Sequence, residues 1–150
     1  MIEVNNLTTV SADEEFLKKV VEKVLESENK NKDLSIALVG QGRIRELNKK
    51  YRGKNRVTDV LAFGDNDGLP PPPIHRCGGL GEIVICLREV KKNAKRFDSN
   101  FETELAKVLI HGILHLLGQD HEKNEIAAKK MEEKQNYYLG LCQKLILSLV

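Results

Sequence analysis

Three of the four histidines in this 150-residue chain lie in one short run, HGILHLLGQDH. His111 and His115 are four residues apart in an apolar segment, so a helix would place both imidazoles on one face, one turn apart. Gly118 follows, where a helix can end in a left-handed cap and return His121 to the same place. Three neutral imidazoles with one open position are typical of a catalytic zinc site, whereas a structural site closes with a fourth protein ligand. We therefore predict one zinc or similar divalent ion per chain, held by His111, His115 and His121; the alternative is a buried helix with unrelated histidines.

The spacing of this motif, HxxxHxxGxxH, is that of the metzincin peptidases, in which a glutamate next to the first histidine is the general base. Gly112 occupies that position here, so the usual peptidase chemistry is not expected. A zinc metallopeptidase or another metallohydrolase remains the alternative reading of the three histidines. A glycine inside a helix costs about 1 kcal/mol relative to alanine. Gly112 therefore indicates a close approach at this point, either by a packed neighbouring element or by a substrate at the metal.

A second group of residues suited to chemistry is basic. Seven basic residues lie between positions 43 and 56 against one acidic residue, Glu46; they are Arg43, Arg45, Lys49, Lys50, Arg52, Lys54 and Arg56. Such a local excess is typical of contact with phosphate, and Arg52 and Arg56 could each bind a phosphate with two parallel hydrogen bonds. The cluster predicts nucleic-acid binding, while any single lysine in it could equally belong to a solvated helix face.

The composition predicts one soluble domain over residues 1–150. Its 41% hydrophobic content is enough for a core, and no run is long and apolar enough to span a membrane. The N-terminus lacks a signal-peptide layout, and Cys77, Cys86 and Cys142 form no CxxC motif, so we expect a cytoplasmic protein with reduced thiols. Cys86 is expected in the core. His75 and Cys77 could together bind a metal, although two ligands in one loop are weak evidence.

The elements that must position these residues alternate between strand and helix. Strands are expected at 2–7, 34–39, 57–63 and 80–86. Helices are expected from a capping box at Ser11, in the basic segment to about 51, and at 87–97, 101–117 and 124–139. This order predicts an α+β fold with a four-stranded mixed sheet packed with about five helices. All four prolines lie in 64–79, which we expect to be an extended surface loop.

Three segments carry a resemblance to a known family. HGILHLLGQDH resembles the HGxLHLxGYDH signature of the YbeY family, bacterial endoribonucleases of rRNA maturation. LNKKYRGKNRVTDVLAF (47–63) and LGEIVIC (80–86) resemble two further family blocks, LNxxYRxxxxxTDVLSF and LGDIVI, in the family's order. With the segments between them, the resemblance spans nearly the whole chain. Gln119, Glu82 and Ala62 stand where the family pattern has Tyr, Asp and Ser, and none of these differences removes a metal ligand.

The resemblance implies a single-strand-specific, zinc-dependent endoribonuclease of rRNA 3′-end maturation and ribosome quality control, with rRNA and the small ribosomal subunit as partners. Arg52 matches the arginine of the family's YR block and would hold the scissile phosphate. Asp120 and Glu82 are the other candidate catalytic residues, as groups that orient an imidazole or a water. A ribosome-binding factor with a structural zinc is a third possibility, and the sequence leaves the oligomeric state open.

The nucleophile has two possible identities. Zinc can lower the pKa of bound water to about 7, so attack by water needs no carboxylate base. Attack by the ribose 2′-hydroxyl usually needs a separate general acid, and the only histidine outside the metal site is His75, in the proline-rich segment. The sequence therefore favours attack by water and leaves the second route open.

Overall fold

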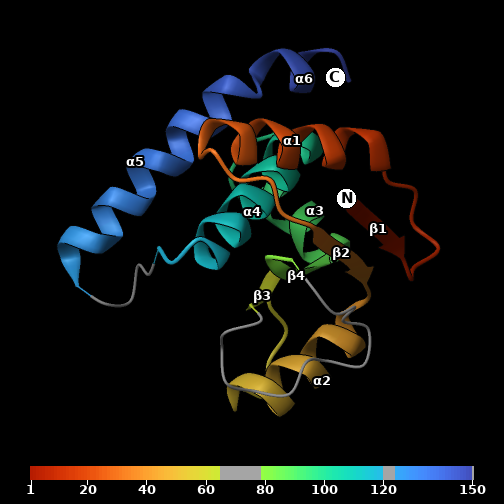
Figure 1. The fold of residues 1–150 in the computed structure, drawn as a ribbon. Helices are drawn as coiled ribbons and strands as arrows, with labels where there is room; N and C mark the ends of the chain where they lie inside the picture. The colour runs from red at the N-terminus through yellow and green to blue at the C-terminus, as the bar shows by residue number, and fades with distance from the viewer. Residues whose placement is uncertain (65–78, 120–123, 150) are drawn as a thin grey trace.

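The computed structural model describes residues 1–64, 79–119 and 124–149 (Figure 1). In chain order the elements are β1 Ile2–Asn6, α1 Glu14–Ser27, β2 Leu34–Val39, α2 Gln41–Arg52, β3 Val60–Gly64, β4 Gly81–Cys86, α3 Leu87–Arg96, α4 Phe101–Leu116, α5 Glu125–Leu141 and α6 Gln143–Leu147. The predicted α+β class and four-stranded sheet are confirmed. The described residues form six helices where about five were expected, because the last helical segment is divided at Cys142. None of these helices is long and apolar enough to cross a membrane.

The sheet is mixed and has the strand order β1-β2-β4-β3. β1 pairs with β2, and β2 with β4, in parallel, whereas β3 runs antiparallel to β4. β2 and β4 are buried along their whole length, as expected for central strands covered on both faces. β3 forms one edge of the sheet, and its residues alternate between buried and partly exposed. The outer side of β3 is therefore available to a functional site.

The two faces of the sheet carry different helices. Ile83 and Ile85 of β4 belong to the larger core with residues of α1 and α4, whereas Val84 and Cys86 pack with Ile44 of α2. This division follows from the alternation of side chains along a strand. Figure 1 shows the result, with α1 and α4 on one side of the sheet and α2 on the other. Cys86 is buried in the smaller core, as predicted.

Two predicted starting positions differ from the structure by more than one residue. α1 begins at Glu14 with Asp13 as its N-cap, two residues after the expected cap at Ser11. The Asp13 carboxylate accepts a hydrogen bond from the Phe16 N–H at 3.0 Å, and its negative charge also favours the N-terminal end of the helix dipole. β3 begins at Val60, not at residue 57. The expected apolar face of α1 is confirmed, with Phe16, Leu17, Val20, Val21, Val24 and Leu25 buried.

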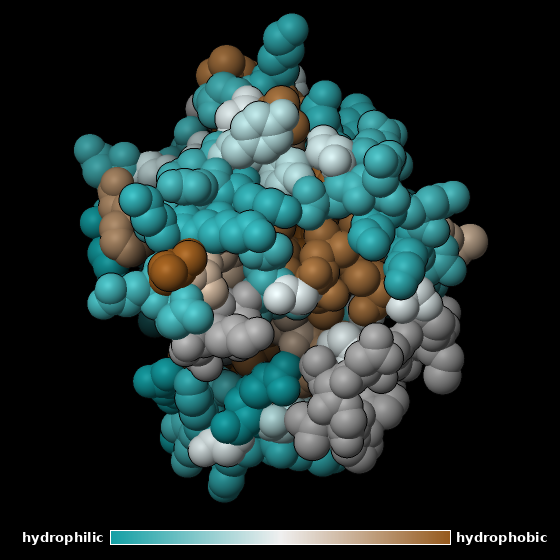
Figure 2. All heavy atoms as spheres, turned by 60° about the vertical axis from the view of Figure 1, so that its left-hand side comes forward, coloured by the Kyte–Doolittle hydropathy of each residue, from teal (hydrophilic) through white to brown (hydrophobic). Residues whose placement is uncertain are grey.

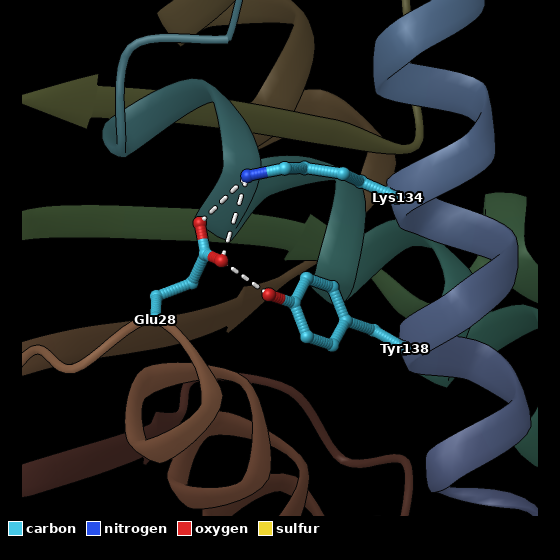
Figure 3. Close-up of polar contacts among 3 residues, drawn as sticks. All are labelled: Glu28, Lys134 and Tyr138. Carbon is cyan, nitrogen blue, oxygen red and sulfur yellow. Dashed lines mark hydrogen bonds and ion pairs between the residues drawn. The ribbon is translucent and has the colours of Figure 1, made fainter.

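A polar cluster joins α5 to the end of α1 (Figure 3). The Glu28 carboxylate accepts hydrogen bonds from the Lys134 ammonium at 3.0 Å and from the Tyr138 hydroxyl. Burial alone would raise the pKa of Glu28, but the hydrogen bonds from Tyr138 and Lys134 and the charge of Lys134 lower it on balance. Burial and the hydrogen bond to Glu28 raise the pKa of Tyr138. The cluster therefore fixes α5 to a residue more than a hundred positions earlier in the chain.

Glu28→Gln should lower the free energy of unfolding at pH 7 by about 1 kcal/mol, because it weakens two hydrogen bonds to a partly exposed carboxylate. Since the pKa of Glu28 is lowered in the folded protein, its contribution is present above the ordinary value of 4.5 and is lost as the pH falls below it. Urea unfolding of wild type and Glu28→Gln at pH 7 and pH 3.5 measures this. The difference in unfolding free energy between the two proteins should shrink at the lower pH. Glu26→Gln, on the exposed side of α1, is the control and should change nothing at either pH.

Candidate functional site

Helix α4 carries the two described histidines of the motif. It begins at the N-cap Asn100, whose side-chain oxygen accepts a hydrogen bond from the Thr103 N–H at 2.8 Å. The rings of His111 and His115 lie on the same side of the helix with their centroids 4.8 Å apart. Both line a cavity of about 860 Å³. The shared face expected from their spacing is therefore present, and it opens into a space large enough for a substrate.

The end of α4 reverses the chain at Gly118, as the sequence predicts. Gly118 has a φ of 94°, its N–H donates to the His115 carbonyl, and the Gln119 N–H donates to the Leu114 carbonyl, both at 3.0 Å. This pair of bonds is the Schellman arrangement that ends many helices. The residues that follow, Asp120 and His121, lie outside the described residues, as do His75 and Cys77. In the part of the chain that is described, no three His, Cys, Asp or Glu side chains form a group that could hold a metal ion.

Gln135 orients the first histidine. Nδ1 of His111 donates a hydrogen bond to the Gln135 side-chain oxygen, at 2.9 Å, across the contact between α4 and α5. An amide oxygen can only accept, so the proton is on Nδ1 and Nε2 is the nitrogen that would bind a metal. Such a partner fixes both the tautomer and the ring orientation of a ligand histidine. Two adjacent imidazoles, one of them already oriented, fit a divalent ion. The sequence did not predict Gln135, because nothing in its local pattern shows that α5 lies against α4.

Gly112 allows α4 to approach the sheet closely. A Cβ at this position would lie 3.1 Å from Cγ2 and 3.2 Å from Cδ1 of Ile83, a fully buried side chain of β4. Both distances are shorter than an ordinary van der Waals contact. Of the two explanations that the sequence left open for this glycine, the structure therefore supports helix packing. This contact also sets the height of His111 and His115 above the sheet.

Arg52 is the last residue of α2 and lies against the edge strand β3. Helix α2 ends at Gly53, which has a φ of 71°. The Arg52 guanidinium donates to the Ala62 carbonyl at 2.5 Å, and its Cζ lies 5.0 Å from the centre of the Phe63 ring. These contacts place Arg52 in the lining of the same cavity as His111 and His115. Although α2 and α4 cover opposite faces of the sheet, their residues meet around the edge strand.

The structure divides the rest of the basic cluster. Lys54 and Arg56 also line the cavity, whereas Arg43, Arg45, Lys49 and Lys50 do not belong to its lining. On the outer part of α2, Arg43 lies 3.8 Å from Glu46, and Arg45 donates to Asn55 at 2.9 Å. Three of the seven predicted RNA-binding residues thus share the cavity with the histidines.

Glu82 lies on the face of the sheet opposite α4. It is a buried residue of β4, 1% exposed, whose neighbour across the β3–β4 pair is Phe63. By the alternation of the strand it belongs to the face that carries Val84 and α2, not to the face of Ile83 and α4. Glu82 is absent from the cavity lining, and the side chain seen on His111 is that of Gln135.

Another part of the cavity lining comes from α3, the residue that follows it and α4. It includes Asn93, Phe97, Glu104 and Lys107. Asn93 donates to the Asp59 carboxylate at 3.1 Å, which ties α3 to the segment before β3. Figure 2 views the molecule with the left-hand side of Figure 1 turned forward and shows a hollow with hydrophobic atoms in its depth and hydrophilic side chains around it. The cavity lining thus combines two imidazoles, three basic side chains and an aromatic ring.

The chain is similar to known proteins over most of its length. Residues 2–143 match the family model of endoribonuclease YbeY. The endoribonuclease YbeY of Persephonella marina is 42% identical over 127 residues, which cover 84% of this chain and 81% of the relative. The endoribonuclease YbeY of Thermotoga maritima is 40% identical over 125 residues, which cover 83% of this chain and 77% of the relative. A solution structure of TM1509 from Thermotoga maritima superposes with a TM-score of 0.62 at 37% identity, covering 93% of this chain and 87% of the other.

These matches make the protein a hydrolase that cuts nucleic acid internally. More specifically, the chain belongs to the endoribonuclease YbeY family, and its substrate is RNA.

Gly112→Ala should lower the free energy of unfolding by about 1–2 kcal/mol. The new methyl group would overlap Ile83, and this cost exceeds the gain in helix propensity of about 1 kcal/mol. Urea unfolding measures the change. In an Ile83→Val background, which lacks Cδ1, the loss should be smaller. Gly42→Ala is the matched control in α2: its Cβ would meet nothing within 4 Å, so it should raise stability by up to about 1 kcal/mol. Equal effects at Gly112 and Gly42 would contradict the packing explanation.

Proposed function

We propose that the protein is a single-strand-specific, zinc-dependent endoribonuclease that acts in the cytoplasm, in rRNA 3′-end maturation and ribosome quality control on the small subunit. The supporting observation is that His111 and His115 share one cavity with Arg52, Lys54 and Arg56. Cleavage of a phosphodiester needs a way to activate the nucleophile and cations to neutralise the growing phosphate charge. Imidazoles that can hold a metal and basic side chains in the lining of one cavity provide both.

His111, His115 and His121 would hold the zinc ion. When bound, zinc acts as a Lewis acid and makes water a strong nucleophile at neutral pH, which suits a site with Gly112 in place of a glutamate base. Gln135 keeps the proton of His111 on Nδ1, so that Nε2 has its lone pair available for the ion. Asp120, next to His121 in sequence, remains the candidate to orient an imidazole or carry a proton. Glu82 is the weaker candidate, because it belongs to the other face of the sheet.

Arg52 would bind the scissile phosphate. Its guanidinium is already held by the Ala62 carbonyl and the Phe63 ring, so little side-chain freedom is lost when a phosphate binds. A cation fixed in advance where negative charge develops stabilises the transition state more than the ground state. Lys54 and Arg56, on the same side of the cavity, would bind the neighbouring phosphates.

His115→Ala should abolish stoichiometric binding of zinc, measured by elemental analysis of the purified, folded protein. Gln135→Leu leaves all three ligands in place, so it should still bind zinc but lose it to a competing chelator at about 10–100-fold lower chelator concentration. His75→Ala is the control, since it removes the one histidine outside the motif. An unchanged zinc content in His115→Ala would eliminate the proposed site.

The wild-type protein should cleave single-stranded RNA, leave duplex RNA largely intact and not hydrolyse casein. It should also shorten a 3′-extended small-subunit rRNA precursor. Arg52→Ala should keep its fold and zinc content but cleave single-stranded RNA about 100-fold more slowly or worse. Arg43→Ala, a basic residue outside the cavity lining, is the control and should cleave nearly as well as wild type. Hydrolysis of casein without cleavage of RNA would overturn the proposed function, and a wild-type rate for Arg52→Ala would overturn only the role of Arg52.

A further inference from the structure

Phe97 is an exposed aromatic residue in the lining of the cavity that also holds Arg52. It follows the last residue of α3, keeps 58% of its surface exposed and lines the cavity. The Lys107 ammonium lies 5.7 Å from the centre of its ring. An exposed ring beside a cation is the arrangement with which proteins bind single-stranded nucleic acid, because every base has a face that can stack and every nucleotide carries a phosphate.

Glu104 is a buried carboxylate in the same lining. It lies one turn of α4 before Lys107 and is only 4% exposed, yet it lines the cavity. Among the described residues, its carboxylate accepts no hydrogen bond and forms no ion pair; Lys107 lies over Phe97 instead. The Glu104 oxygens border the cavity and are not among the enclosed side-chain atoms that lack a partner, so they are available to a ligand that brings N–H groups.

The part of the lining with Glu104 is also close enough to the histidines to hold a neighbouring nucleotide. Glu104 precedes His111 by seven residues, or two turns, which is about 10.5 Å along the helix axis. Residues at this spacing lie on one face of the helix. A nucleotide on this part of the lining would therefore neighbour the one whose phosphate lies at His111 and Arg52.

We propose that Phe97, Lys107 and Glu104 form a nucleobase subsite next to the cleavage position. This proposal rests on the endoribonuclease function and adds a substrate preference to it. A base stacks on Phe97, Lys107 binds the phosphate of that nucleotide, and the Glu104 carboxylate accepts hydrogen bonds from the base edge. Adenine, cytosine and guanine each carry an amino group that can donate to a carboxylate. Uracil offers only one N–H, between two carbonyl oxygens that a carboxylate repels. The subsite therefore disfavours uracil.

The subsite can be tested by binding. The full-length protein is titrated into fluorescent single-stranded oligomers of A, C or U, with anisotropy as the readout and a gel after each titration to verify that the RNA is intact. Phe97→Ala should weaken binding of the A oligomer about tenfold, and Phe97→Trp should restore it. Tyr137→Ala, which removes an aromatic ring of similar exposure outside the cavity lining, is the control. Lys107→Ala should also weaken this binding. Lys91→Ala is its control, because the Lys91 ammonium lies 5.8 Å from the centre of the Phe101 ring and neither residue lines the cavity.

Glu104→Gln tests the base preference. Wild type should bind the A and C oligomers at least about fivefold more tightly than the U oligomer, and Glu104→Gln, whose amide can also donate, should reduce that ratio towards one. If wild type binds RNA and Phe97→Ala binds it equally well, the subsite is wrong and the endoribonuclease function still stands. Equal binding of all three oligomers by wild type would overturn the role of Glu104. A wild-type protein that neither binds nor cleaves single-stranded RNA would overturn the proposed function and the subsite together.

Discussion

The contact between Gly112 and Ile83 determines where the cavity residues lie. Because Gly112 has no side chain, the backbone of α4 packs directly on the Ile83 side chain of β4, and this contact holds His111 and His115, one position before and three positions after the glycine, close to the sheet. Their neighbours on α4 are almost all apolar and buried, so the helix has little freedom to shift or rotate. The position of the imidazoles is thus set by core packing, which is stiff, and not by a surface loop.

The edge strand β3 is the second constraint. A strand with only one partner in the sheet has a row of backbone groups on its outer side, which natural proteins usually cover. Here the Ala62 carbonyl accepts from Arg52, so one arginine both covers the edge and lies at the cavity. Since α2 and α4 lie on opposite faces of the sheet, the edge is the place where a side chain from each can border one space. Moving Arg52 to the middle of α2 would leave it over the sheet, away from the histidines.

A structural feature can be predicted from the sequence when it depends on a few neighbouring residues. The HxxxH spacing, the reversal at Gly118 and the apolar face of α1 follow from helix geometry over a few residues, and all three are present. The N-cap of α1 was misplaced because Ser11 and Asp13 are both suitable caps and only the structure shows which one binds the Phe16 N–H. Gln135 could not be predicted, since its role depends on the packing of α5 on α4. Likewise, the sequence does not show that the segment after α2, with Lys54 and Arg56, lines the cavity while Arg43 and Arg45 of α2 do not.

The cluster at Glu28 has a consequence for the order in which the site is assembled during synthesis. The helix with His111 and His115 precedes α5 in the chain, so both imidazoles leave the ribosome before Gln135 does. The residue that anchors α5 is made earlier, because Glu28 precedes Lys134 and Tyr138 by more than a hundred residues. Contacts of such long sequence separation close a large loop and form late in folding. The nascent chain therefore contains both histidines before α5 docks at the end of α1 and Gln135 orients His111.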